Sequence, residues 1–312
     1  MALKEENQRG RKSEGKSKRH GARNQNRHKH FVKWLMETFP EEFCPSSNKV
    51  TNPSCLEGCD VKERYQKNKI ENERETMNSK DKNTNVINTT NQQWHILDVA
   101  GGKGEVSARL VMCHRHHVIM IDPRPANIVD CFERVVLPKI PNKWQRRLED
   151  QRSTDPDFIK NIVQSRFQQV ITTFDEDKFD NNKTDEISLE LRRAVENSTL
   201  ILGLHADGAT EAIVDVALKF NKPFVVVPCC VFPNFFKSRT ILVECTDNND
   251  KDDDNGKNKN NNNNNGTAHK MKSIPVRTHD QFCLYLLRKD PRFVMEQLPF
   301  EGRNIAIWWD GK

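Results

Sequence analysis

The sequence predicts an α/β fold with a doubly wound, mostly parallel sheet, and three observations lead to this prediction. An apolar run, a glycine-rich turn and a helix follow one another in residues 94–114, which is the layout of the first β-α unit of nucleotide-binding folds. Strand-like and helix-like stretches then alternate along the chain, as in parallel sheets. Residues 293–300 and 304–309 flank a short glycine turn and are expected to close the fold as an antiparallel hairpin.

Composition limits the classes of protein that fit. Hydrophobic residues make up 35% of the 312 residues and charged residues 30%, and the hydrophobic shortfall lies in polar segments, so the folded part is smaller than the chain. No stretch approaches the roughly 20 apolar residues of a membrane span, so no membrane contact is expected. The nine scattered cysteines, without a signal peptide, are typical of reduced thiols. We therefore expect an intracellular protein, cytoplasmic or nuclear.

The N-terminal segment is strongly basic. Residues 1–33 hold eleven Lys or Arg against three acids, whereas the whole chain carries a net charge of +6, so the remainder is slightly acidic. Residues 1–28 contain too few apolar side chains to fold alone, and we expect a disordered tail there. Two interpretations stay open: a solvated tail, or a segment that contacts RNA phosphates or acts as a nuclear address.

A short amphipathic helix is expected within residues 29–43, packed on the core that follows. Its apolar side chains recur at helical spacing, and Pro40 ends the periodic stretch. These side chains are Phe31, Trp34, Leu35 and Phe39.

Residues 44–91 are rich in Lys, Asn and Glu and are expected to form a flexible linker. Cys55 and Cys59 are close in sequence, but no second tight pair lies near them, and a structural zinc site needs four ligands. No metal is therefore expected, and the role of these two cysteines and of Cys44 stays open.

The core domain is expected to span residues 92–312, and its first ligand-binding feature is the turn in D-V-A-G-G-K-G. Glycines let the backbone approach a ligand closely, and the following helix offers free N–H groups. The cofactor-binding residues predicted here are Asp98, Ala100, Gly101, Gly102 and Gly104. A dinucleotide pattern fits less well, because Ser107 holds the place of the third glycine. The alternative is a turn that only joins a strand to a helix.

A second strand-like stretch, residues 117–122, ends in Asp122. This is the interval at which nucleotide-binding folds place a carboxylate on ribose hydroxyls, and one carboxylate can accept hydrogen bonds from both of them. We expect Asp122 to bind the cofactor from a solvent-reachable strand end. The alternative is a turn residue before Pro123.

The remaining elements follow in chain order. Strands are expected at 167–174, 198–205 and 222–228, and helices at 126–136, 143–150, 187–196 and 210–220, with a further helix around 282–287. Asp175, which follows the first of these strands, is a candidate contact for adenine. Residues 247–266 are nearly all Asn, Asp, Lys and Gly, so they are expected to form a disordered insertion within the core domain.

Ligands of open α/β sheets bind beyond the carboxyl ends of the strands, where further chemistry-bearing residues gather. His205 is a candidate general base, or alternatively a strand-end histidine hydrogen-bonded to backbone. Asp207 is a candidate for orienting the acceptor, or alternatively the N-cap of the next helix. Cys229 and Cys230 are expected to line a substrate pocket, with burial as small hydrophobic side chains as the alternative.

Five β-α units followed by a hairpin resemble the seven-stranded, three-layer, Rossmann-like fold of methyltransferases, and the D-x-G-x-G-x-G pattern resembles their first motif, with Ala100 in the first glycine slot. The sequences L-D-V-A-G-G-K-G-E-V-S and V-P-C-C are distantly similar to methyltransferase-25-like proteins and to tRNA ribose methylases with a G-G-K-G or G-C-G-K-G turn. The resemblance covers roughly residues 92–312. It implies S-adenosyl-L-methionine (SAM) as cofactor and methyl transfer to RNA or protein, although the zinc-finger cysteines of the tRNA enzymes are not evident.

Two other functions stay open. A catalytically silent module would keep the cofactor pocket and hold RNA through the basic tail. A nicotinamide-dependent oxidoreductase is disfavoured by Ser107 and by the closing hairpin, which dinucleotide folds lack. Titration with SAM and transfer assays on cellular RNA would separate the first two functions.

Overall fold

The computed structural model describes residues 26–43, 95–245 and 270–312. Their centre is a seven-stranded sheet in the order β3-β2-β1-β4-β5-β9-β8. The strands are β1 (His95–Val99), β2 (Val118–Ile121), β3 (Phe167–Val170), β4 (Ser198–Leu204), β5 (Phe224–Val227), β8 (Val294–Gln297) and β9 (Ile305–Trp309). The first five run parallel, and β9 pairs antiparallel with both β5 and β8. The predicted doubly wound sheet with a C-terminal hairpin is confirmed.

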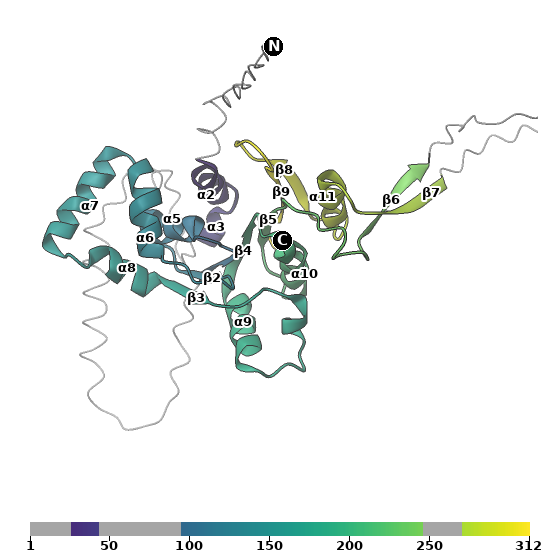
Figure 1. Cartoon of the computed structure of the whole chain (residues 1–312), viewed down its shortest axis with the longest axis horizontal. Coiled ribbons are helices and arrows are strands. Elements are labelled where there is room, and N and C mark those ends of the chain that lie inside the picture. The colour runs from purple at the N-terminus through teal and green to yellow at the C-terminus, as the bar shows by residue number, and fades with distance from the viewer. Residues whose placement is uncertain (1–25, 44–94, 246–269) are drawn as a thin grey trace, which may run out of the picture. The chain divides into compact units, whose positions relative to one another are not determined.

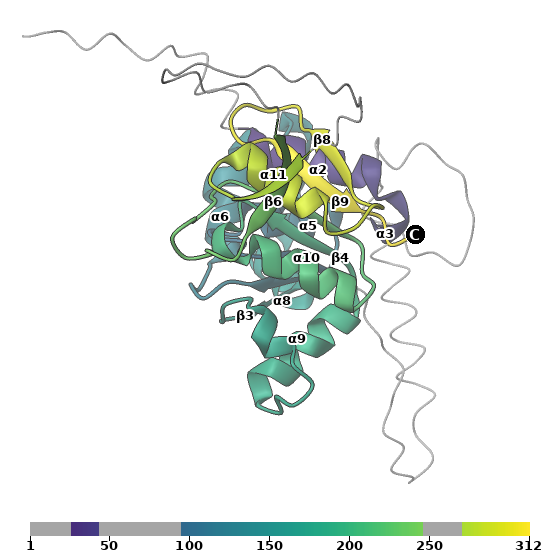
Figure 2. The same cartoon turned by 90° about the vertical axis from the view of Figure 1, so that its right-hand side faces the viewer.

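Helices cover both faces of the sheet, because alternate residues of each strand point to opposite sides. On β1, Ile96 packs with the first layer, whereas Leu97 and Val99 pack with the second. The first layer holds α2 (Arg27–Thr38), α5 (Glu105–His114), α6 (Ile128–Cys131) and α8 (Phe158–Arg166), and the second holds α9 (Glu186–Glu196), α10 (Thr210–Lys219) and α11 (His279–Leu287). Figure 1 shows the sheet between these layers, and Figure 2 shows the second layer in front of it. The central strands read as continuous apolar runs because both of their faces are buried.

The N-terminal helix α2 packs on the core. It begins at Arg27, two residues before the expected range of 29–43, and its apolar side chains lie in the core next to α5. The Trp34 ring meets Trp308 of β9 edge-on, with ring centroids 6.4 Å apart. Its indole N–H also donates to Glu296 Oε1 of β8 at 3.1 Å. A buried Trp with its N–H satisfied is a strong anchor, so α2 is fixed to the C-terminal hairpin as well as to α5.

Several element boundaries differ from the prediction. The third strand ends at Val170 rather than near residue 174, because the chain turns away from the sheet there and leaves Ile171 58% exposed. The helix expected at 126–136 begins at Ile128, capped by Asn127, and widens into a π-helix at Phe132–Val136. The further short elements are α3 (Pro40–Phe43), α7 (Asn142–Thr154), and 3-10 turns at Leu137–Lys139, Glu176–Phe179 and Asp207–Ala209.

Helix α8 and a second sheet were not predicted. Strands β6 (Thr240–Cys245) and β7 (Lys270–Pro275) form an antiparallel pair whose register begins Cys245↔Lys270. The polar insertion therefore joins two paired strands. Residues 247–266, most of the basic tail and the linker with Cys44, Cys55 and Cys59 lie outside the described residues. Every helix in the described ranges is too short or too polar to cross a lipid bilayer.

Candidate functional site

The glycine turn follows β1 directly and holds three residues with left-handed backbone angles, at Ala100 (φ 55°), Gly102 (φ 62°) and Gly104 (φ 78°). A Cβ on Gly104 would lie 2.3 Å from the Ile128 side chain, so this glycine is required for packing. At Gly102 the nearest atom to such a Cβ is 4.0 Å away, on Arg124. The backbone of Gly102 is therefore open to a ligand on the side that faces Arg124.

Asp122 lies directly opposite Gly102. Its Oδ2 accepts the Gly102 backbone N–H at 2.9 Å, and its Oδ1 accepts the Arg124 backbone N–H at 2.9 Å and Nε at 3.1 Å. Burial raises the pKa of Asp122, but the hydrogen bonds from Arg124 and Gly102 outweigh it and hold that pKa below its usual value. The expectation of a solvent-reachable carboxylate is wrong, since the Asp122 side chain is 1% exposed beneath an Arg124 side chain that is 75% exposed.

Asp98, the acid at the end of β1, is buried beneath the glycine turn. Its side chain is buried, and the Ser107 hydroxyl of α5 donates to its Oδ2 at 2.6 Å. Burial raises the pKa of Asp98 to about 6, because Ser107 offsets the loss of water only in part and Asp122 adds a second negative charge nearby. Ser107, which replaces the third glycine of the dinucleotide pattern, thus donates the hydrogen bond that the buried Asp98 carboxylate accepts.

An ion pair between Glu105 and His28 links the start of α5 to the start of α2. Glu105 Oε2 lies 2.9 Å from His28 Nδ1, and Glu105 Oε1 lies 2.7 Å from Arg109 Nη2. Burial raises the pKa of Glu105, but hydrogen bonds from His28 and Arg109 lower it to about 2. This contact holds the first turn of α2 next to the glycine turn. The basic N-terminal segment leads into this turn of α2.

The end of β4 carries His205 and Asp207, both with positive φ, at 56° and 48°. His205 Nδ1 is buried and has no hydrogen-bond partner among the described residues. Burial, followed by the charges of Arg27 and His28, lowers the pKa of His205 to about 4. The alternative interpretation of Asp207 as an N-cap is wrong, because α10 begins at Thr210 and no side chain caps it.

Asp207 instead faces the end of β5. Cys229 Sγ donates to Asp207 Oδ1 at 2.8 Å, and Cys229, Cys230 and Asp207 each place one donor atom within 4.8 Å of the others. Burial and the Asp207 hydrogen bond raise the pKa of Cys229, and Asp207 raises that of Cys230. The alternative of small buried side chains does not fit, because Cys229 is half-buried and Cys230 is exposed.

The four strand ends singled out from the sequence therefore belong to one edge of the sheet, where the strand order reverses between β1 and β4. Arg124 was not identified as a site residue from the sequence, although a cation two residues after Asp122 is close enough in sequence to pair with that carboxylate. Asp175 lies farther along, exposed and paired with Lys178 at 3.2 Å.

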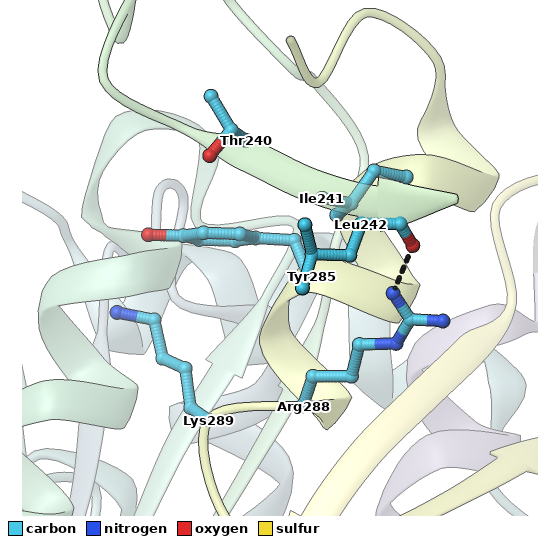
Figure 3. A pocket seen from close by; sticks show the side chains of 6 residues that line it. All are labelled: Thr240, Ile241, Leu242, Tyr285, Arg288 and Lys289. Carbon is cyan, nitrogen blue, oxygen red and sulfur yellow. Dashed lines mark hydrogen bonds between the residues drawn. The ribbon is translucent and has the colours of Figure 1, made fainter. Parts of the chain in front are cut away.

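A separate hollow of about 260 Å³ lies between β6 and the C-terminal end of α11 (Figure 3). Its charged side chains already have partners: Arg288 donates to the Leu242 carbonyl at 2.7 Å, and Lys289 Nζ lies 2.8 Å from Glu211. A hollow whose cations are occupied offers little to a charged ligand, so the strand ends remain the candidate site.

No protein-family model matches the chain, and neither curated proteins nor solved structures gave a significant match.

Proposed function

We propose that this chain is a SAM-dependent methyltransferase whose acceptor is RNA. The observation that carries the proposal is the ionised Asp122 carboxylate held against the Gly102 backbone at the reversal point of the sheet. Open α/β sheets bind nucleoside-containing ligands at this point. The antiparallel β8–β9 pair at the edge of the sheet supports the methyltransferase resemblance over a dinucleotide-binding fold.

The residues at the strand ends fit SAM. Asp122 would accept the ribose hydroxyls, and the side chain that now occupies its oxygens, Arg124, is largely exposed and free to move aside. The open backbone at Gly102 would lie against the rest of the cofactor. When bound, SAM supplies an electrophilic methyl group. Asp98 would act from beneath by holding the turn in place, because its carboxylate is buried and bonded to Ser107.

His205 and Asp207 stand on the acceptor side of this arrangement. Both follow β4, the neighbour of β1, and the His205 Nδ1 atom is not engaged by any described group. Methyl transfer needs the acceptor atom aligned with the methyl group, and proton removal where that atom carries one. We assign acceptor positioning to Asp207 and proton acceptance to His205.

The loop after Cys230 favours RNA over protein as the acceptor. Phe235 in this loop is 83% exposed, and the Phe236 ring lies 3.9 Å from where a Cβ on Gly208 would stand. Exposed aromatic rings stack on unpaired bases, and neighbouring cations contact phosphates. Lys237 in this loop and Lys103 in the glycine turn are both exposed, and the basic N-terminal segment leads into α2.

The test has two steps on the full chain. Calorimetry with SAM should show binding that is weakened at least about tenfold in Asp122→Asn, as expected when a charged hydrogen bond is lost. The control Glu176→Ala, an exposed acid in the 3-10 turn that follows β3, should bind as the parent does. Methyl-labelled SAM should then mark cellular RNA, in a signal removed by ribonuclease.

Three results would contradict the proposal in different ways. If the parent chain does not bind SAM, SAM is not its cofactor. Binding without transfer to any fraction would establish a catalytically silent module. Label that survives ribonuclease and is removed by protease would make the acceptor a protein.

A further inference from the structure

The side chains of Asp207, Cys229 and Cys230 form a cluster of three metal-ligand types on two neighbouring strand ends. Their donor atoms lie within 4.8 Å of one another. A tetrahedral zinc ion with Zn–S near 2.3 Å and Zn–O near 2.0 Å holds sulfur and oxygen about 3.5 Å apart. The 2.8 Å between Cys229 Sγ and Asp207 Oδ1 is a little shorter than this, so a small outward shift of either side chain would make room for the ion.

We propose that Asp207, Cys229 and Cys230 bind a zinc ion. Two thiolates and one carboxylate are a donor set that favours zinc over the hard cations, which prefer oxygen ligands alone. The inference goes beyond the proposed function and does not rest on it, because the ion can be measured without SAM or any acceptor.

Charge favours a cation among these three groups. As thiolates, the two cysteines would place two negative charges beside the Asp207 carboxylate, and a divalent cation between the three donor atoms would offset that repulsion. On binding, each thiol loses its proton to solvent and the ion takes both sulfur lone pairs, so that affinity rises with pH. The ion then carries three protein ligands.

The exposure of the cluster matches a site with an open position. Asp207 and Cys230 are exposed and Cys229 is half-buried, so the fourth place around the ion would face solvent. Structural zinc sites use four protein ligands, whereas sites with three keep one position for water or a substrate atom. Cys131 and Cys283, by contrast, are buried in the apolar clusters and serve as core side chains.

The experiment uses the full chain, reduced and stripped of metal, in a background where Cys44, Cys55, Cys59 and Cys245 are serine. After loading with Zn²⁺ and gel filtration, one zinc per chain is expected. Loading with Co²⁺ should give near-ultraviolet charge-transfer absorption from thiolate ligands. Both signals should vanish in Cys229→Ser/Cys230→Ser.

Two further variants make the result specific. Cys113→Ser removes a half-buried thiol elsewhere and should keep the full zinc content. Asp207→Asn should keep the thiolate absorption but bind zinc at least about tenfold more weakly, since a neutral amide replaces a charged ligand. Melting temperatures of the metal-free variants check that each one folds. Zinc content that is unchanged in Cys229→Ser/Cys230→Ser, or a parent background that binds no zinc at all, would overturn the proposal.

Discussion

The backbone N–H of Gly102 donates to Asp122 Oδ2 across 2.9 Å, joining the turn after β1 to the end of β2. The same carboxylate also accepts the backbone N–H of Arg124 and lies under the exposed Arg124 side chain, so the Asp122 side chain is buried. Asp122 is thus a support for the turn and, in the proposed function, the acceptor for ribose hydroxyls. Replacing Asp122 is therefore expected to lower both the stability of the fold and the affinity for SAM. A substitution of its partner Arg124 separates these two roles.

Arg124→Ala is the variant that makes this separation. The arginine competes with ribose for the Asp122 oxygens, so its removal should tighten SAM binding by about two- to fivefold, the small effect expected of an exposed ion pair. Melting temperature should stay within about a degree. Calorimetry compares the SAM affinity of Arg124→Ala with that of the control Arg152→Ala, which loses the exposed ion pair with Glu133. The affinity of the control should equal that of the parent. Weaker binding in Arg124→Ala alone would make the arginine a ligand of the cofactor.

Gly102 and Gly302 form a natural matched pair for testing the turn. Both have positive φ, 62° and 95°, and a Cβ on either would have no atom closer than about 4 Å. Alanine at either position should cost about 1–2 kcal/mol from backbone strain alone. Only Gly102→Ala should also weaken SAM binding, because its Cβ would enter the open space before Asp122. Equal SAM affinities in the two variants, measured by calorimetry beside thermal melting, would place the cofactor elsewhere.

The sequence allowed the parts of the fold that depend on local pattern to be predicted. The β1–turn–α5 unit and the closing hairpin each lie within about twenty residues, where periodicity and glycine placement are informative. The pairing of β6 with β7 was not predictable in this way, because 24 residues separate Cys245 from Lys270. The burial of Asp122 was also missed, since it is set by Gly102 and Arg124 and not by the strand on which Asp122 lies.

Asp98→Asn should stabilise the fold at neutral and higher pH. The native carboxyl keeps its proton up to a pKa of about 6, whereas in the unfolded chain it loses that proton near 3.8. The native state therefore binds more protons between these values, and stability falls as pH rises through this window. The difference corresponds to at most about 3 kcal/mol. Asparagine can still accept the Ser107 hydroxyl and carries no charge to bury.

Thermal melting from pH 4 to pH 8 tests this prediction. Asp98→Asn should match the parent near pH 4 and exceed it increasingly up to about pH 7. The control Asp157→Asn, an exposed aspartate that directly precedes α8 and makes no side-chain cap bond, should follow the parent throughout. A variant that melts below the parent at pH 8 would mean that ionised Asp98 holds the turn better than a neutral group does.

Deleting residues 247–266 should leave the fold intact. The register Cys245↔Lys270 already holds the two flanking strands together, and the deletion leaves four residues between them, a common length for a hairpin loop. Shortening the loop from 24 residues to four lowers the entropy cost of closing it by about 1–2 kcal/mol, so the melting temperature should stay constant or rise by a few degrees. Deleting 267–275 in its place removes β7, including Ile274, which pairs with Ile241, and should expose Ile241, which is 6% exposed in the intact fold. If the first deletion lowers the melting temperature as much as the second, the insertion itself contributes contacts to the folded core.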